Sequence, residues 1–203
     1  MSSEYQTLSA PAEATVREKM SRFIAMAIPV ETADEARECV RRIANEYHDA
    51  RHVCYAYQLG ADGEQYQSSD NGEPSGTAGR PILGQIRSAG LTNLLIVVVR
   101  YFGGIKLGTP GLIAAYREAA RQAIEAGEKV TRYEMASVSF TFPYVAMNSV
   151  MKLVKESGVK VEDQQCDNSC RMTLSIRADQ ADALAQKIAD ISGTSILSPS
   201  NQP

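Results

Sequence analysis

The residues best suited to binding a ligand surround a short glycine loop. Arg100 and Lys106 lie on either side of Gly103 and Gly104. The missing Cβ atoms of the two glycines permit positive φ and let a ligand or another backbone segment approach closely. Glycines that serve only a tight, closely packed turn would give the same pattern, so spacing alone leaves both interpretations open.

A helix is predicted to begin directly after this loop. Thr109 can cap its N-terminus, and Pro110 suits its first turn. Because a helix N-terminus presents free N–H groups and about half a positive charge, the loop that carries Lys106 is a candidate anion site. The glycines miss the G-x-G-x-x-G spacing, and Thr109 follows Gly108 where a P-loop needs lysine. ATP and NAD are therefore disfavoured, and no cofactor is predicted.

A second group of polar residues lies in the glycine-rich segment 61–79, which is expected to be a long loop. Asp70 and Glu73 have the setting of turn carboxylates. No five- or six-oxygen ligand pattern accompanies them, so no metal site is predicted. Thr77 is expected to cap a helix that runs to Ser88. Long loops in compact domains tend to be functional or disordered, which makes this segment a candidate for binding.

The distribution of charge points to the same region. The chain carries 21 basic and 24 acidic residues, a net charge of −3, so it lacks the global basic excess of many nucleic-acid binders. Between residues 74 and 117 there is no Asp or Glu, and the basic residues there are Arg80, Arg87, Arg100, Lys106 and Arg117. A local positive field is expected. We also expect the two loops to converge on one cleft, with Arg100 or Lys106 within reach of Asp70 or Glu73.

His52 and Cys54 could form a nucleophile and its base. Residues 51–59 alternate as a strand does, which places both side chains on one face. Side chains two apart on a strand are about 7 Å apart along the backbone, however, so direct activation of the thiol is disfavoured. A role in lining a site or packing in the core is the preferred interpretation.

Hydrophobic patterning predicts the elements that position these residues. The β-branched run from Leu94 to Arg100 is typical of a central strand covered on both faces. Another strand is expected at residues 21–30. Thr32 and Glu35 match a capping box for the helix that follows. The helix that begins near Thr109 is expected to end at Gly127.

The chain is predicted to form two domains in an α+β fold. Helical patterning stops at Gly127, and strict strand alternation begins again at Ala136. We place the first domain at residues 1–132 and the second at 133–198, with a disordered tail at 199–203. The second domain has the order β-α-β-β-α-β, which is the ferredoxin-like split motif.

The remaining composition suggests a soluble, cytoplasmic protein. No run approaches the roughly 18 apolar residues needed to span a bilayer, so no membrane partner is expected. Four cysteines form no C-x-x-C pair, and they are predicted to be reduced thiols. Cys166 and Cys170 flank a predicted turn at Asp167-Asn168, where a cross-strand contact between them is the alternative to packing.

Four motifs together resemble the bacterial YigZ branch of the IMPACT family. They are SRF at residues 21–23, ARHVC at 50–54, DNGEPSGTAGRP at 70–81 and VRYFGGIKLG at 99–108. The resemblance implies a first domain similar to the left-handed βαβ domain of a small-subunit ribosomal protein. It implies a second domain similar to the last domain of elongation factor G. Eukaryotic relatives act in translational control through protein partners, and the family supplies no catalytic residue to carry over.

These observations lead to a translation-linked regulatory protein that binds RNA or the translation machinery through a glycine-rich, locally basic cleft. RNA, ribosome-associated factors or another protein partner are the expected partners. The predicted ligand-binding residues are Arg22, His52, Asp70, Glu73, Gly76, Thr77, Arg80, Arg100, Gly103, Gly104 and Lys106. One alternative is an enzyme acting on a small phosphorylated or peptide substrate at the same loops, with Asp70, Glu73 or His52 as acid or base. The lack of a recognised nucleophile, metal set or nucleotide fingerprint disfavours it. A protein-interaction module with neither activity is the third hypothesis.

Overall fold

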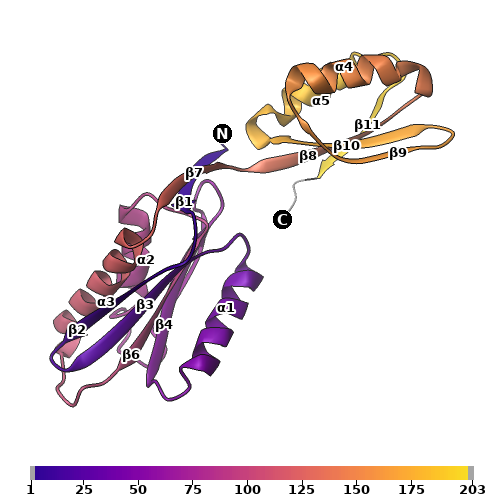
Figure 1. Cartoon of the computed structure of the whole chain (residues 1–203). Coiled ribbons are helices and arrows are strands. Elements are labelled where there is room, and N and C mark those ends of the chain that lie inside the picture. Colours follow the sequence, from indigo (N-terminus) through magenta and orange to yellow (C-terminus); the bar gives the residue numbers. More distant parts are fainter. Residues whose placement is uncertain (1–2, 201–203) are drawn as a thin grey trace. The chain divides into compact units, whose positions relative to one another are not determined.

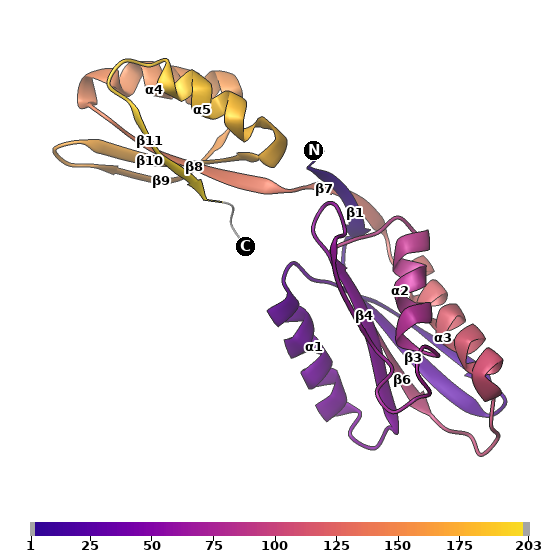
Figure 2. The same ribbon diagram turned by 180° about the vertical axis from the view of Figure 1, so that it is seen from behind.

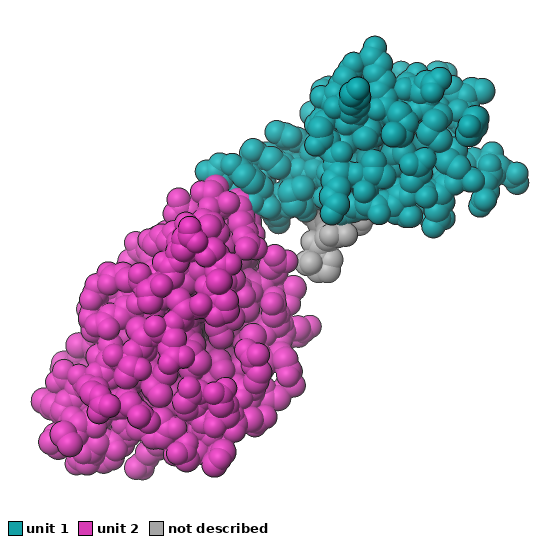
Figure 3. All heavy atoms as spheres, in the orientation of Figure 1, with its two compact units in different colours: residues 1–4, 133–203 teal, residues 5–132 magenta. Residues whose placement is uncertain are grey.

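The structure, a computed structural model, describes residues 3–200 and divides them into two compact units. The N-terminal unit comprises residues 5–132, and the C-terminal unit comprises residues 133–200 together with residues 3–4 (Figure 3). The α+β class and the two-domain arrangement are therefore confirmed. Within residues 3–200, no helix is long and apolar enough to cross a membrane.

A five-stranded sheet forms the centre of the N-terminal unit. Its strand order is β2-β3-β6-β4-β5, and two further strands, β1 and β7, pair with each other. The strands are β1 (Glu4–Leu8), β2 (Ala12–Glu18), β3 (Ser21–Pro29), β4 (His52–Leu59), β5 (Gln65–Ser69), β6 (Leu94–Tyr101) and β7 (Lys129–Tyr133). The helices are α1 (Ala33–Glu46), α2 (Gly79–Ser88) and α3 (Gly108–Glu125).

Strand β6 is the central strand that the β-branched run predicts. It pairs antiparallel with both β3 and β4, so β3, α1 and β4 make a crossover unit around it. Helix α1 covers one face of the sheet, while α2 and α3 cover the other (Figures 1 and 2). Residues 94–100 are all buried, because the side chains of β6 point alternately into the two layers.

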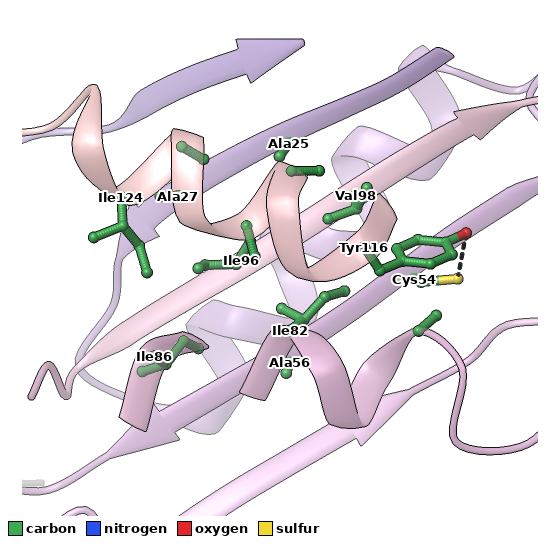
Figure 4. Packing of buried hydrophobic residues seen from close by; sticks show 14 of the residues in the cluster. Ala25, Ala27, Cys54, Ala56, Ile82, Ile86, Ile96, Val98, Tyr116 and Ile124 are labelled. Atoms are coloured by element: carbon green, nitrogen blue, oxygen red, sulfur yellow. Dashed lines mark hydrogen bonds between the residues drawn. The ribbon is translucent and has the colours of Figure 1, made fainter. Parts of the chain in front are cut away.

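Each face of the sheet has its own hydrophobic core. Val97 and Val99 of β6 pack under α1 with residues such as Ile43. Ile96 and Val98 belong to the other core, which α2 and α3 complete (Figure 4). Residue 100 follows Ile96 and Val98 at the same spacing of two, so alternation directs the Arg100 side chain toward α2 and α3.

The start of α1 follows the sequence, whereas the starts of α2 and α3 differ from the prediction. The Glu35 N–H donates to the Thr32 hydroxyl at 3.2 Å, which is one half of the predicted capping box, and the Glu35 carboxylate accepts from the Glu31 N–H at 2.8 Å instead of from that of Thr32. Thr77 does not cap α2: its hydroxyl donates to the Pro74 carbonyl at 2.6 Å. Thr109 lies inside α3, and Leu107, the residue before the helix, makes no side-chain capping hydrogen bond. The helix starts two residues earlier than expected, because Leu107 rather than Thr109 is its N-cap.

The segment 61–79 is not one continuous loop, as predicted, because it contains strand β5. Strand β5 pairs antiparallel with β4, from Tyr55 opposite Ser69 to Leu59 opposite Gln65. Its sequence, QYQSS, is polar and mostly exposed at the edge of the sheet. An edge strand that faces solvent on both sides has no hydrophobic alternation by which sequence could reveal it.

The C-terminal unit has the predicted ferredoxin-like order. Its strands lie in the order β11-β8-β10-β9, all antiparallel, with two helices between them in sequence. The elements are β8 (Met135–Phe142), α4 (Met147–Ser157), β9 (Lys160–Cys166), β10 (Cys170–Arg177), α5 (Ala181–Ala189) and β11 (Ser195–Ser200). Val138, Phe140 and Phe142 point into the core, as their alternation predicts.

Two expectations for this unit are wrong. Strand β11 continues to Ser200, because a register shift after Ile196 lets Pro199 pair with Val138. Residues 199 and 200 are therefore not a tail, and residues 201–203 lie outside the described residues. Cys166 and Cys170 are disulfide-bonded rather than reduced, because the hairpin turn places them directly opposite each other.

Candidate functional site

Strand pairing brings three of the site residues into one row. Phe23 on β3 and His52 on β4 are both paired with Arg100 on β6. All three belong to the sheet face that α2 and α3 cover, at the end of β6 where α3 begins. The Arg100 guanidinium lies 5.5 Å from the centre of the Phe23 ring and 5.6 Å from that of Phe102. The two rings thus cover the cation with apolar surface.

Glu73 joins the glycine-rich segment to this row. Its Oε1 lies 2.6 Å from Nη1 of Arg100, and the side chains of both residues are buried. The Tyr116 hydroxyl of α3 donates to the same oxygen at 2.8 Å. The prediction that the two loops converge, with Arg100 in reach of Glu73, is confirmed by this pair. Tyr116 and Arg100 together compensate a carboxylate that would otherwise be costly to bury.

The Cys54 thiol is protonated in this environment. Burial raises the pKa of Cys54 to about 12. Burial, followed by the neighbouring Cys54, also raises the pKa of Tyr116. The thiol donates to the Asp70 carbonyl at 2.9 Å and lies 3.4 Å from the Tyr116 hydroxyl (Figure 4). A thiolate nucleophile at neutral pH is therefore disfavoured, in agreement with the sequence interpretation.

His52 is held by the backbone of the glycine-rich segment. Its Nδ1 lies 2.9 Å from the Asn71 carbonyl oxygen. With a proton on Nδ1, Nε2 is left free at the edge of the site, 3.9 Å from Oε2 of Glu73. A Cβ on Gly72 would come within 3.3 Å of the ring, so glycine there lets the turn pack closely on His52. The geometry gives the ring a fixed orientation.

A pocket of about 440 Å³ opens beside these residues, and we call it the Arg100 pocket. It combines the end of β6, the glycine-rich segment and the first turn of α3. Its lining consists of Arg51, His52, Gly72, Glu73, Pro74, Arg100, Phe102, Lys106, Leu107, Gly108, Thr109 and Leu112. Three basic side chains line it against the single carboxylate of Glu73, so its net charge is positive.

The first residues of α3 line this pocket, so their backbone N–H groups are candidate donors to a ligand. The first N–H groups of a helix have no partner within the helix, and Pro110 carries no N–H. The available donors are therefore those of Leu107, Gly108 and Thr109, and all three residues line the pocket. No acidic side chain lies in the first turn. The pocket thus contains the helix N-terminus that the sequence predicted as an anion site.

Four predicted residues organise the glycine-rich segment outside the lining of the pocket. The Asp70 carboxylate accepts from the N–H groups of Gly76, Ala78 and Gly79 at 2.8 to 2.9 Å. Burial opposes ionisation of Asp70, but these hydrogen bonds outweigh it and lower the pKa of the carboxyl. Asp70, not Thr77, supplies the acceptor at the start of α2. Arg80 is exposed on the first turn of that helix.

Three further predicted residues do not line the pocket, and Arg22 points to the opposite face of the sheet, the one that α1 covers, because it alternates with Phe23. Arg22 lies over the Tyr101 ring, 4.7 Å from its centre. A Cβ on Gly103 would be 2.1 Å from the Met20 carbonyl carbon, so this glycine permits close backbone packing. Gly104 has φ of +89° and no atom near the position of a Cβ. For Gly103 the packing interpretation is therefore sufficient.

Sequence reasoning missed several lining residues. Arg51 directly precedes His52, and Phe102 lies between Arg100 and Lys106 in the acid-free stretch. An aromatic residue among basic residues is a signal that could have identified Phe102. The contribution of Leu107 and Gly108 depends on where α3 begins, which the sequence analysis placed two residues too late. Among the described residues, no group of three or more His, Cys, Asp or Glu side chains could hold a metal ion.

Comparison with known proteins identifies clear relatives of the whole chain. A family model described as the Impact N-terminal domain matches residues 19–124. The IMPACT family member YigZ of Escherichia coli (strain K12) is 32% identical over 190 residues, which is 93% of each chain. An IMPACT family member of Thermus thermophilus is 36% identical over 154 residues, which is 76% of this chain and 83% of that one. A crystal structure of a hypothetical protein matches with a TM-score of 0.76 and 30% identity, covering 100% of both chains.

Proposed function

This chain belongs to the IMPACT family, and from that premise we propose that it is a translation-linked regulatory protein that binds single-stranded RNA in the Arg100 pocket. The observation that supports the proposal is the lining of the pocket. It combines the exposed cations Arg51 and Lys106 with the N–H groups at the start of α3 and an exposed aromatic ring. Proteins that bind single strands pair a basic groove with aromatic rings on which bases stack.

Each feature has a distinct part in the proposed complex. Arg51 and Lys106 contact backbone phosphates, because neither has an acidic partner among the described ion pairs. Arg100 is buried and paired with Glu73, so it adds positive charge to the wall of the pocket without contacting a backbone phosphate. Phe102, whose exposed fraction is 42%, offers its ring to a base. The acid-free stretch is thus not a uniform basic surface. We expect Arg51, rather than Arg100, to contact phosphate.

The test is fluorescence anisotropy with a single-stranded RNA of mixed sequence and hydroxyl groups at both ends. Two phosphate contacts should give a log-log salt slope of roughly −1.4, at about −0.7 per phosphate. Arg51→Ala and Lys106→Ala should each weaken binding and flatten the slope by about 0.7. Phe102→Ala should weaken binding with an unchanged slope, because stacking releases no counterions.

Two exposed basic residues away from the pocket serve as controls. Arg42→Ala, on α1, is matched to the Arg51 variant, and Lys187→Ala, on α5, is matched to the Lys106 variant. Neither should change affinity or slope. Absence of salt-dependent binding at low ionic strength would overturn the proposal, as would equal losses in the control variants.

A specific observation also favours docking of a protein partner at the same end of the unit. Met20 and Ile105 expose 77% and 51% of their surface. Met20 holds a left-handed φ of +67° in the turn between β2 and β3, a conformation that side chains rarely adopt. If RNA binding fails, Met20→Ser should release a copurifying protein that the unmodified chain retains, with an unchanged melting temperature. Retention of the protein by that variant would reject this second candidate.

A further inference from the structure

We infer that the Arg100 pocket receives a terminal phosphate, the dianion of a phosphomonoester, rather than a phosphate within a chain. The inference rests on the proposed function and specifies which part of the ligand enters the pocket. The same chemistry occurs at the end of an RNA chain and in a free nucleoside monophosphate. The experiment below therefore includes both sources.

The first support is the set of backbone donors at the start of α3. This helix has 18 residues, so its dipole is fully developed. The N–H groups of Leu107, Gly108 and Thr109 belong to residues that line the pocket. Gly108 has φ of +72°, which a residue with a side chain would adopt only with strain. Backbone donors in this arrangement match the oxygens of a phosphate group.

The second support is Arg100, which is independent of the helix. Its side chain is only 6% exposed, yet it lines the pocket. Nη1 is bonded to Glu73, but Nε has no hydrogen-bond partner among residues 3–200. A buried guanidinium N–H without a partner is costly, and the positive charge of Arg100 at the wall of the pocket favours an anion there.

The charge balance favours a dianion over a diester. A phosphomonoester carries about −1.5 to −2 charges at pH 7 and three free oxygens, whereas an internal phosphate carries one charge and two free oxygens. Arg51 and Lys106 are two cations without a carboxylate partner in the pocket. Glu73 already accepts hydrogen bonds from Arg100 and Tyr116, so its charge is compensated. We therefore place the phosphate at the α3 side of the pocket, away from Glu73.

The size of the pocket fits one terminal nucleotide. Its volume of about 440 Å³ is in the range of small-molecule sites, which run from about 300 to 1,000 Å³. Phe102 is exposed beside it, where the base of that nucleotide could stack on the ring. A ligand with its phosphate on α3 and its base on Phe102 uses both features of the lining.

The test compares ends of one RNA sequence with the full-length protein. Internally labelled 12-nucleotide RNA is prepared with a 5′-phosphate, with a 3′-phosphate, and with hydroxyl groups at both ends. We expect one phosphorylated form to bind about tenfold more tightly than the hydroxyl form, because of the added charge-assisted hydrogen bonds. Adenosine monophosphate should compete with that form, and adenosine should not. Competition by the mononucleotide without any preference among RNA ends would assign the site to free nucleotides.

A charge placed at Thr109 separates binding from folding. Thr109→Asp puts a carboxylate in the first turn of α3, where its charge favours the helix dipole and repels an anion bound at the same N-terminus. It should raise or preserve the melting temperature while it abolishes the tenfold preference. Thr109→Asn has nearly the same shape without the charge, and it should keep the preference within about threefold, as hydrogen bonds between neutral groups are weak.

The outcomes distinguish this inference from the proposed function. Equal binding of all three RNA forms, with Lys106→Ala still weakening it, would overturn the terminal-phosphate inference and leave RNA binding intact. Absence of binding by every RNA form and by the mononucleotide would overturn both. An unchanged preference in Thr109→Asp would place the phosphate elsewhere and overturn the assignment to α3.

Discussion

Glu73 of the glycine-rich segment and Arg100 of strand β6 form a buried ion pair, with 2.6 Å between Oε1 and Nη1. The two residues are 27 positions apart in sequence. The pair fixes the glycine-rich segment to the end of the central strand and thereby forms one wall of the pocket. It also limits the role of Arg100, because a cation so engaged is not available to a solvent-exposed phosphate chain.

Removing one member of this pair should destabilise the fold more than removing both. Glu73→Leu leaves the Arg100 charge buried without its partner, which typically costs about 3 to 5 kcal/mol. The double variant Glu73→Leu with Arg100→Met replaces both charges by apolar groups and should recover a large part of that loss. Urea unfolding at pH 7 measures both. A double variant less stable than either single variant would show that the pair is not the dominant interaction.

Sequence predicted the position of Arg100 better than it predicted its partner. The β-branched run locates β6, and alternation assigns Arg100 and His52 to their faces. Glu73 could be expected near Arg100 only in general terms, because contact depends on how a polar loop folds back. Tyr116 shows the same limit: helical spacing identifies it as a core residue, but not its hydroxyl as a donor to Glu73.

Interactions that span polar segments account for most of the other differences. Asp70 caps α2 from eight or nine positions away, whereas sequence rules search the residue next to the helix and selected Thr77. Strand β5 carries no alternation because neither of its faces is buried. Such features depend on long-range pairing, which local patterns do not encode.

Asp70 should stabilise the protein at neutral pH and lose that effect in acid. Its folded-state pKa is lowered, so its contribution is complete above the unfolded value of about 3.9 and disappears as the pH falls through the folded value. Asp70→Asn should therefore reduce the free energy of unfolding at pH 7 by about 1 to 2 kcal/mol, the range of helix caps. Urea unfolding at pH 7 and pH 3 should show a smaller difference in acid. A constant difference would exclude the charged carboxylate as the cause.

The cysteines should react in a defined order. Cys39 is partly exposed and Cys54 is buried, while Cys166 and Cys170 are bonded to each other. Because burial raises the pKa of Cys54 to about 12, little thiolate is present at pH 8. Ellman's reagent should modify one thiol in the native protein and a second only in denaturant, and reductant should release two more. The Cys39→Ser variant should lose the fast phase. Four reactive thiols in denaturant without reductant would contradict the disulfide.

The two adjacent glycines of the β6–α3 loop should respond differently to the same substitution. A Cβ on Gly103 would be 2.1 Å from a backbone carbon of Met20, a contact that only a shift of one strand end could relieve. A Cβ on Gly104 would meet no atom within 4 Å, and its cost comes from φ of +89° alone. Gly104→Ala should therefore cost about 1 to 2 kcal/mol, the penalty for a left-handed residue with a side chain.

Gly103→Ala should cost more, about 3 kcal/mol or above, because the backbone itself must move. Thermal and urea unfolding of the two variants give the comparison, and RNA binding by the folded fraction supplies the second readout. If Gly103 serves packing alone, its variant should lose stability while the fraction that remains folded still binds RNA. Gly104→Ala should lose only the smaller amount of stability and keep RNA binding, because its site is open and lies outside the lining of the pocket. A stable Gly103→Ala protein that no longer binds RNA would instead make this glycine part of the ligand site, as the first interpretation of its sequence allows.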